Sequence, residues 1–115
     1  MDPIDLILNW FERISAIPRC SKNEEAIARW FEAWAQGRGW ASRRDATGNL
    51  VIEVPASPGC ERAPGVIVQG HLDMVCERTP TSTHDFAADP IRLIREGDWL
   101  SLDGSDNDLF VFLAY

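Results

Sequence analysis

Residues 66–80 read VIVQGHLDMVCERTP, an apolar β-branched run that leads through Gly70 into a histidine and an aspartate two positions apart. The run from Val66 to Gln69 is typical of a strand buried on both faces. Positions i and i+2 of a strand share a face, so His71 and Asp73 are expected to project together from the strand's carboxyl end. Open α/β sheets place their ligand sites at that end. A core strand has no use for two ionisable groups there, whereas a metal or catalytic site uses both.

The pair His71 and Asp73 suits metal chemistry. A metal-binding imidazole is usually held by a neighbouring carboxylate that fixes its tautomer, and Asp73 is placed for that part. Taken alone, the motif His-x-Asp favours a satisfied surface pair over a functional one. Serine-nucleophile, Walker A and dinucleotide motifs are absent from the sequence. Metal-dependent hydrolysis is therefore the chemistry that the residues suggest.

Size and charge exclude several classes of protein. The chain has 115 residues, enough for one small domain, and a net charge of −7, which disfavours nucleic acid as a partner. No apolar run approaches the ~20 residues of a membrane span, and no secretory signal is visible. The three cysteines form no C-x-x-C motif, so we expect reduced thiols and no disulfide. These features predict a cytoplasmic protein.

Local patterns predict two helices followed by strands. Apolar residues at helical spacing indicate a helix over 4–17, which Pro18 ends. A second helix follows a capping box of Ser21 and Glu24, and closes at Gly37 or Gly39. Its tryptophans are expected in the core. Two short strands are predicted around a turn at 47–49, and a hairpin around 96–98.

A second carboxylate cluster lies at residues 103–108, with the sequence DGSDND. Asp106 could return to the end of the sheet, where zinc and hard cations both accept such a ligand. On composition alone an ordinary turn is favoured. His84 and Asp85 fit a solvated pair, and Cys76 has few thiol partners for a zinc site.

Longer stretches resemble a known family. The motifs are IPRCSKNEEAIARWFEAWA, RRDATGNLVIEVPASPG, and VIVQGHLDMVCE followed by HDFAADPI. In order and spacing they are similar to the opening of aminoacyl-histidine dipeptidases, which are cytosolic dinuclear zinc peptidases also called Xaa-His or cytosol non-specific dipeptidases. The resemblance covers residues 4 to about 100. It implies an α/β fold, the N-terminal part of a mixed-sheet dinuclear zinc peptidase domain with two helices followed by strands and a hairpin.

The resemblance also implies roles for three residues. His71 matches a zinc ligand, Asp73 the aspartate that orients catalytic groups, and Asp106 the carboxylate that bridges both metals. Two metals bridged in this way polarise a peptide carbonyl and activate a water. The segment before Asp106 is shorter than in the family, and the bulky residues FVFLAY follow where the family has small ones.

The resulting expectation is a truncated, inactive metallo-dipeptidase. Residues 1–115 would be an N-terminal fragment of the catalytic domain, without the lid domain and the remaining ligands. The full-length family implies two zinc ions, with manganese or cobalt as alternatives, a dipeptide substrate such as Xaa-His, and a homodimer as one oligomeric form. The alternative is a small non-catalytic domain that binds a metal or a protein partner, which the apolar tail LFVFLAY suggests.

Overall fold

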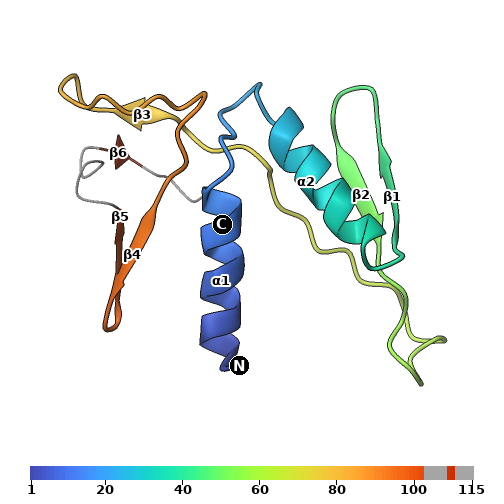
Figure 1. Cartoon of the computed structure of the whole chain (residues 1–115). Helices are drawn as coiled ribbons and strands as arrows, with labels where there is room; N and C mark the ends of the chain where they lie inside the picture. Colours follow the sequence, from blue (N-terminus) through green and yellow to red (C-terminus); the bar gives the residue numbers. More distant parts are fainter. Residues whose placement is uncertain (103–108, 111–115) are drawn as a thin grey trace.

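The computed structural model of the chain describes residues 1–102 and 109–110. These residues form two helices and three two-stranded antiparallel sheets, joined by loops. In Figure 1, α2 (Glu25–Gln36) lies between α1 (Pro3–Ser15) and the hairpin of residues 41–53, and the hairpin of residues 93–102 lies on the other side of α1. The radius of gyration is 16.6 Å, larger than the roughly 13 Å of a compact domain of this length. The arrangement is therefore open. The elements are α1 (Pro3–Ser15), α2 (Glu25–Gln36), β1 (Ala41–Arg44), β2 (Leu50–Glu53), β3 (Glu77–Arg78), β4 (Leu93–Glu96), β5 (Trp99–Leu102) and β6 (Leu109–Phe110).

The first helix begins and ends where the sequence predicts, within two residues. The Asp2 side chain accepts a hydrogen bond of 2.8 Å from the amide of Ile4, and Pro3 occupies the first turn, where its missing N–H costs nothing. Neither helix among the described residues is long and apolar enough to cross a membrane.

Aromatic side chains join α1 to α2. The ring of Trp10 meets those of Trp30 and Trp34 edge-on, with centroids 6.1 and 6.0 Å apart. Arg38 lies over Trp34 at 4.1 Å, so a cation covers part of this cluster. The expectation that the tryptophans of α2 lie in the core is met only in part, because Trp30 and Trp34 pack on Trp10 but remain half-buried.

The predicted capping box is wrong. Glu24 occupies the N-cap position of α2 without a capping side chain, and its carboxylate accepts from the amide of Lys22. Ser21 instead donates to Asp73, far along the chain. At the other end Gly39 adopts φ 71°, a left-handed conformation that glycine tolerates, just after the helix ends.

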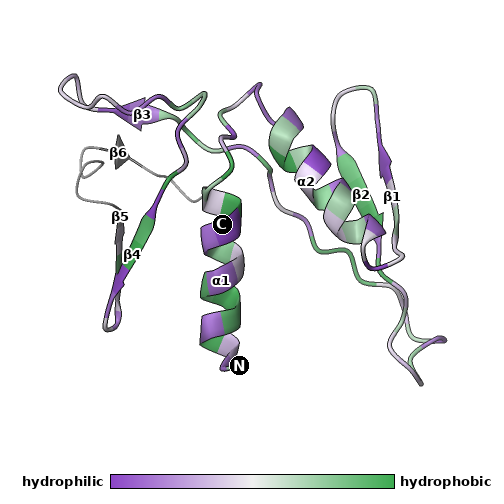
Figure 2. Cartoon of the chain, in the orientation of Figure 1, coloured by the Kyte–Doolittle hydropathy of each residue, from purple (hydrophilic) through white to green (hydrophobic). Residues whose placement is uncertain are grey.

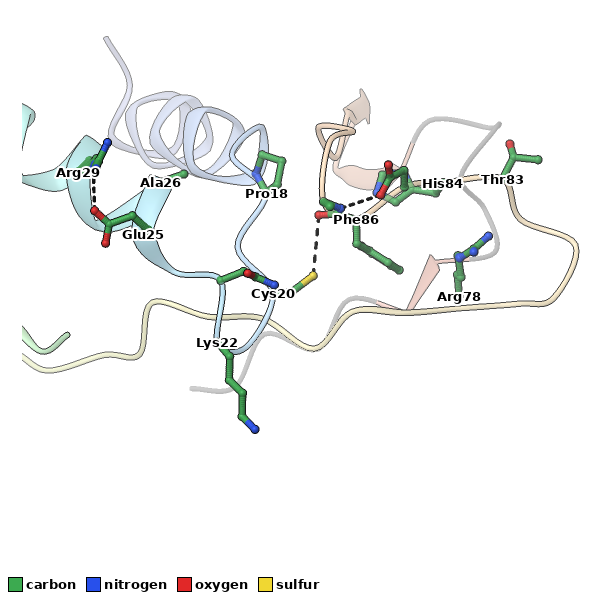
Figure 3. Close-up of a pocket in the computed structure, with 13 residues that line it drawn as sticks. Pro18, Cys20, Lys22, Glu25, Ala26, Arg29, Arg78, Thr83, His84 and Phe86 are labelled. Carbon is green, nitrogen blue, oxygen red and sulfur yellow. Dashed lines mark hydrogen bonds and ion pairs between the residues drawn. The ribbon is translucent and has the colours of Figure 1, made fainter. Parts of the chain in front are cut away.

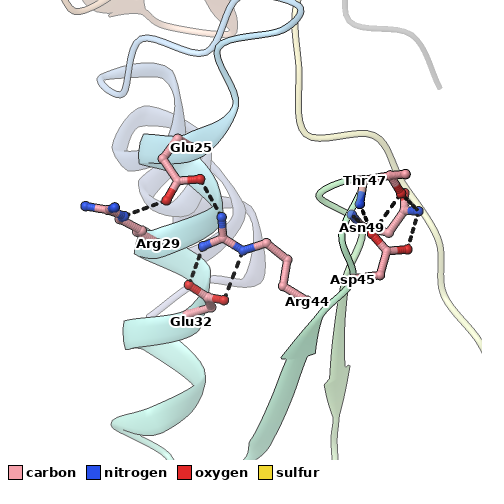
Figure 4. Close-up of polar contacts among 7 residues, drawn as sticks. All are labelled: Glu25, Arg29, Glu32, Arg44, Asp45, Thr47 and Asn49. Carbon is pink, nitrogen blue, oxygen red and sulfur yellow. Dashed lines mark hydrogen bonds and ion pairs between the residues drawn. The ribbon is translucent and has the colours of Figure 1, made fainter.

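The β1–β2 hairpin is docked on α2 through Arg44 (Figure 4). The guanidinium donates to both carboxylate oxygens of Glu32, at 3.1 and 2.6 Å, and also to Glu25. Arg44 lowers the pKa of Glu32 through these hydrogen bonds, and the two glutamates raise the pKa of Arg44. A bidentate pair of this kind fixes direction as well as distance, so it orients the hairpin on the helix.

The second predicted hairpin, β4–β5, is confirmed around Gly97. Buried Ile91, just before β4, anchors this hairpin. Ile91 packs with Met74 in a small core, and Cys76, Phe86 and Leu93 pack against these two residues. The amide of Ile91 also donates to the carbonyl of Ser15 at 3.2 Å. These contacts tie the hairpin to the end of α1.

The predicted buried strand at 66–69 is wrong. Val66, Ile67 and Val68 are 86%, 94% and 93% exposed, and within the described residues no strand pairs with them. They form part of an extended stretch that crosses the molecule (Figure 2). A strand is buried only if other strands flank it, and residues 1–102 and 109–110 form local antiparallel pairs instead of one mixed sheet.

The expectation of free thiols at positions 20 and 76 is also wrong. Cys20 and Cys76 form a disulfide with Cα atoms 5.6 Å apart, although 56 positions separate them in the sequence. Closing a loop of this length restricts the unfolded chain, which corresponds to about 4 kcal/mol in the chain-entropy model. Cysteine spacing alone gave no sign of it, because the pairing depends on the fold. Cys60 is free and exposed.

Asp45 organises the turn between β1 and β2. Its Oδ1 accepts from the amides of Thr47 and Asn49, each at 2.9 Å, and its Oδ2 accepts from the Asn49 side chain at 2.7 Å. These bonds, from Asn49 first and then Thr47, hold the pKa of Asp45 well below its ordinary value. The charged form of the carboxylate is therefore favoured by folding.

This turn generates a prediction about pH. A carboxyl whose pKa falls on folding stabilises the protein above its unfolded pKa, roughly 3.9, and loses that contribution as pH falls toward the folded pKa. Asp45→Asn should therefore lower the melting temperature above about pH 5, and the difference from wild type should shrink in more acidic solution. Circular dichroism melts from neutral pH downward measure it, with Asp98→Asn in the other hairpin turn as a charge control. A difference that stays constant at all pH values would contradict this assignment.

Candidate metal site

His71 and Asp73 lie together, as predicted, although not on a strand. The Nδ1 atom of His71 is 2.9 Å from Oδ1 of Asp73 and 2.8 Å from the backbone oxygen of the same residue. Both neighbours are acceptors, so the neutral imidazole carries its proton on Nδ1. Nε2 is then the nitrogen with a lone pair for a metal.

The carboxylate of Asp73 receives two contacts on separate oxygens. Oδ1 meets the imidazole, and Oδ2 accepts the hydroxyl of Ser21. The Ser21 hydrogen bond is the largest influence that lowers the pKa of Asp73, and His71 lowers it further. The carboxylate therefore stays ionised. Burial lowers the pKa of the Arg19 guanidinium, and the charge of Asp73 opposes that lowering.

Backbone contacts hold the Ser21 loop against the site. The amide of Met74 donates to the carbonyl of Arg19 at 3.0 Å, and Nη1 of Arg19 donates to the carbonyl of Leu72 at 3.2 Å. Cys20 and Met74 form a parallel β-bridge. Together with the disulfide from Cys20, these contacts join residues 19–20 to residues 72–76.

A separate pocket of about 1010 Å³ lies beside this loop (Figure 3). It opens between the start of α2 and the segment 78–87, and Lys22, Arg29 and Arg78 give it three cations beside the carboxylates of Glu25 and Asp85. Neither His71 nor Asp73 lines it. His84, predicted as part of a solvated pair, is instead buried against Phe86 with ring centroids 4.7 Å apart.

The other predicted ligand is not placed. Asp106 lies outside the described residues, as do residues 111–115 of the apolar tail. Among residues 1–102 and 109–110, no group of three or more His, Cys, Asp or Glu side chains is arranged to hold a metal ion. What the structure supplies is one imidazole, with its orienting carboxylate.

Sequence reasoning missed Ser21 and Arg19 as neighbours of the site. Ser21 matched a local capping signal, and 52 positions separate it from Asp73. No local pattern reports a contact over that distance.

Two comparisons identify related proteins, while no protein-family model matches the chain. The chain is 38% identical over 95 residues to a cytosol non-specific dipeptidase of Escherichia coli, across 83% of this chain and 20% of that protein. The crystal structure of the aminoacylhistidine dipeptidase from Vibrio alginolyticus superimposes with a TM-score of 0.77 and 41% identity, across 87% of this chain and 21% of that one. The chain thus spans about a fifth of the length of these relatives. Over that length, the resemblance to the aminoacyl-histidine and cytosol non-specific dipeptidases is confirmed.

Proposed function

We propose that this chain carries part of the catalytic domain of a metal-dependent dipeptidase that cleaves Xaa-His and other dipeptides. The observation that carries the proposal is the His71–Asp73 pair, in which the carboxylate holds the Nδ1 proton of the imidazole. The relatives are dipeptidases by name, which supports the reaction class.

The described donor set fits one ligand of a zinc site. His71 would bind the metal through Nε2, and Asp73 would orient the ring and strengthen its basicity from the far side. Bound zinc would polarise a peptide carbonyl and activate a water. Asp106 would supply a carboxylate that bridges two ions, as the resemblance implies. Zinc is the metal of the proposal, with manganese or cobalt as alternatives. A cytoplasmic location is proposed from the name of the cytosol dipeptidase among the relatives, because the Cys20–Cys76 disulfide removes the argument from reduced thiols.

The 115 residues by themselves are expected to be inactive. No cluster of three ligands exists among the described residues, and a dinuclear centre needs several ligands for each ion. A role as a small binding domain is the second candidate. It is favoured by the exposed apolar residues Val66, Ile67 and Val68, because such a stretch suits a contact with another chain. Purified chain that hydrolyses an Xaa-His dipeptide until a chelator is added would overturn the expectation of inactivity.

Zinc titration tests the metal role of His71 directly. The chain has only two histidines, so the ring nitrogens of both can be followed together in ¹⁵N-labelled protein. We expect zinc to shift Nε2 of His71, to leave His84 unchanged and to be reversed by a chelator. His71→Gln should remove the response. Zinc that shifts only His84, or neither ring, would contradict the assignment.

A chimera tests the reaction. This chain's residues 1–102 would replace the stretch of the E. coli dipeptidase that they match, which restores the remainder of the enzyme. The chimera should hydrolyse Xaa-His dipeptides, His71→Gln should abolish that activity, and Asp73→Asn should lower it by about 10- to 100-fold.

The control for the chimera is His84→Gln, assayed only if circular dichroism shows that it folds. It should retain activity, because His84 packs on Phe86 away from the proposed site. A folded chimera with zinc bound and no activity would refute the dipeptidase role for these residues.

A further inference from the structure

Ser21 contacts the proposed site from a distant part of the sequence. Its hydroxyl donates to Oδ2 of Asp73, while Oδ1 of the same carboxylate meets Nδ1 of His71. Two partners on two oxygens define the rotation of the carboxylate as well as its position. With one partner alone, the Asp73 side chain could change its χ1 rotamer about Cα–Cβ, as well as turn about Cβ–Cγ.

The backbone places Ser21 for this contact. Arg19 and Cys20, the two residues before it, are joined to Leu72, Met74 and Cys76 by hydrogen bonds, a β-bridge and the disulfide. The backbone that carries the Ser21 hydroxyl is therefore held in place before the hydrogen bond to Asp73 forms. Less side-chain and backbone freedom is lost on forming the hydrogen bond than in a mobile loop.

The next residue adopts an unusual conformation. Lys22 has φ 71°, in the left-handed region that lysine rarely occupies, and it is the only non-glycine residue with positive φ in the described part of the chain. Such a conformation is unfavourable for a residue with a side chain, and it is found most often at functional sites. It turns the chain toward α2 directly after Ser21, which leaves Ser21 at Asp73 instead of at the helix start.

The geometry excludes Ser21 as a nucleophile. In a serine triad the hydroxyl donates to the imidazole that will accept its proton. Here both the hydroxyl and the imidazole donate to the same carboxylate, so the imidazole is not in position to accept the proton of Ser21.

We propose that Ser21 is a positioning residue, which locks the carboxylate of Asp73 in the orientation that holds His71 for the metal. This inference rests on the proposed roles of His71 and Asp73. Ser21 acts through Asp73 and does not bind the metal or the substrate itself.

The test measures the orientation of Asp73 without metal. Three-bond couplings to Cγ of Asp73 report whether χ1 occupies one rotamer, and ¹⁵N shifts of His71 near pH 8, where imidazole is neutral, report its tautomer. Ser21→Ala should average χ1 and lower the population of the Nδ1–H tautomer. Ser21→Thr keeps the hydroxyl and should restore both readings. Ser57→Ala, in an exposed loop, is the matched control and should behave as wild type.

Zinc affinity provides the second reading, by competition with a chromophoric chelator. Ser21→Ala should weaken binding by about tenfold, and Ser21→Thr should recover it. A single χ1 rotamer for Asp73 in folded Ser21→Ala would overturn the positioning role whatever the zinc result. If χ1 averages as expected but wild type binds no zinc at His71, the positioning role stands and the proposed function fails.

Discussion

Arg19 and Cys20 lie alongside Leu72, Met74 and Cys76, and the rest of the structure depends on this contact. It contains a backbone hydrogen bond from Met74 to Arg19, a parallel bridge and a disulfide. Met74 is also 4% exposed and packs against Ile91, whose amide is bonded to the end of α1. The end of α1 and the β4–β5 hairpin are joined through these residues, and an ion pair between Arg95 and Asp5 adds a direct contact between β4 and α1.

The proposed site lies in the segment 66–76, at the point where its contacts with Arg19 and Cys20 begin. Upstream, Val66, Ile67 and Val68 extend into solvent, and downstream, Met74 is buried. Asp73 occupies the last position before the buried residue, and Ser21 reaches it from the loop on the other side of the contact. The orientation of the His71 ring therefore depends on residues 19–21, which hold Asp73 through Ser21, as well as on the neighbouring residues 72–73.

Local interactions made much of this fold predictable. The helices follow from apolar spacing and from Pro18, and the hairpins follow from turns at Gly48 and Gly97 that adopt positive φ. The meeting of His71 and Asp73 was also predictable, because only two positions separate them. The position of Ser21, the Cys20–Cys76 pair and the exposure of Val66 were not. Each depends on which distant segments are present to pack together, and no short pattern carries that information.

Amide hydrogen exchange of Met74 tests most directly whether residues 19–20 hold the segment that carries the site. The Met74 amide donates to Arg19 in a buried position, whereas Val66, Ile67 and Val68 have no strand partner among the described residues. In the oxidised chain, Met74 should exchange far more slowly than these three amides. Exchange of Met74 as fast as that of Val66 to Val68 would show that the contact does not hold in solution, and would contradict the account of the site.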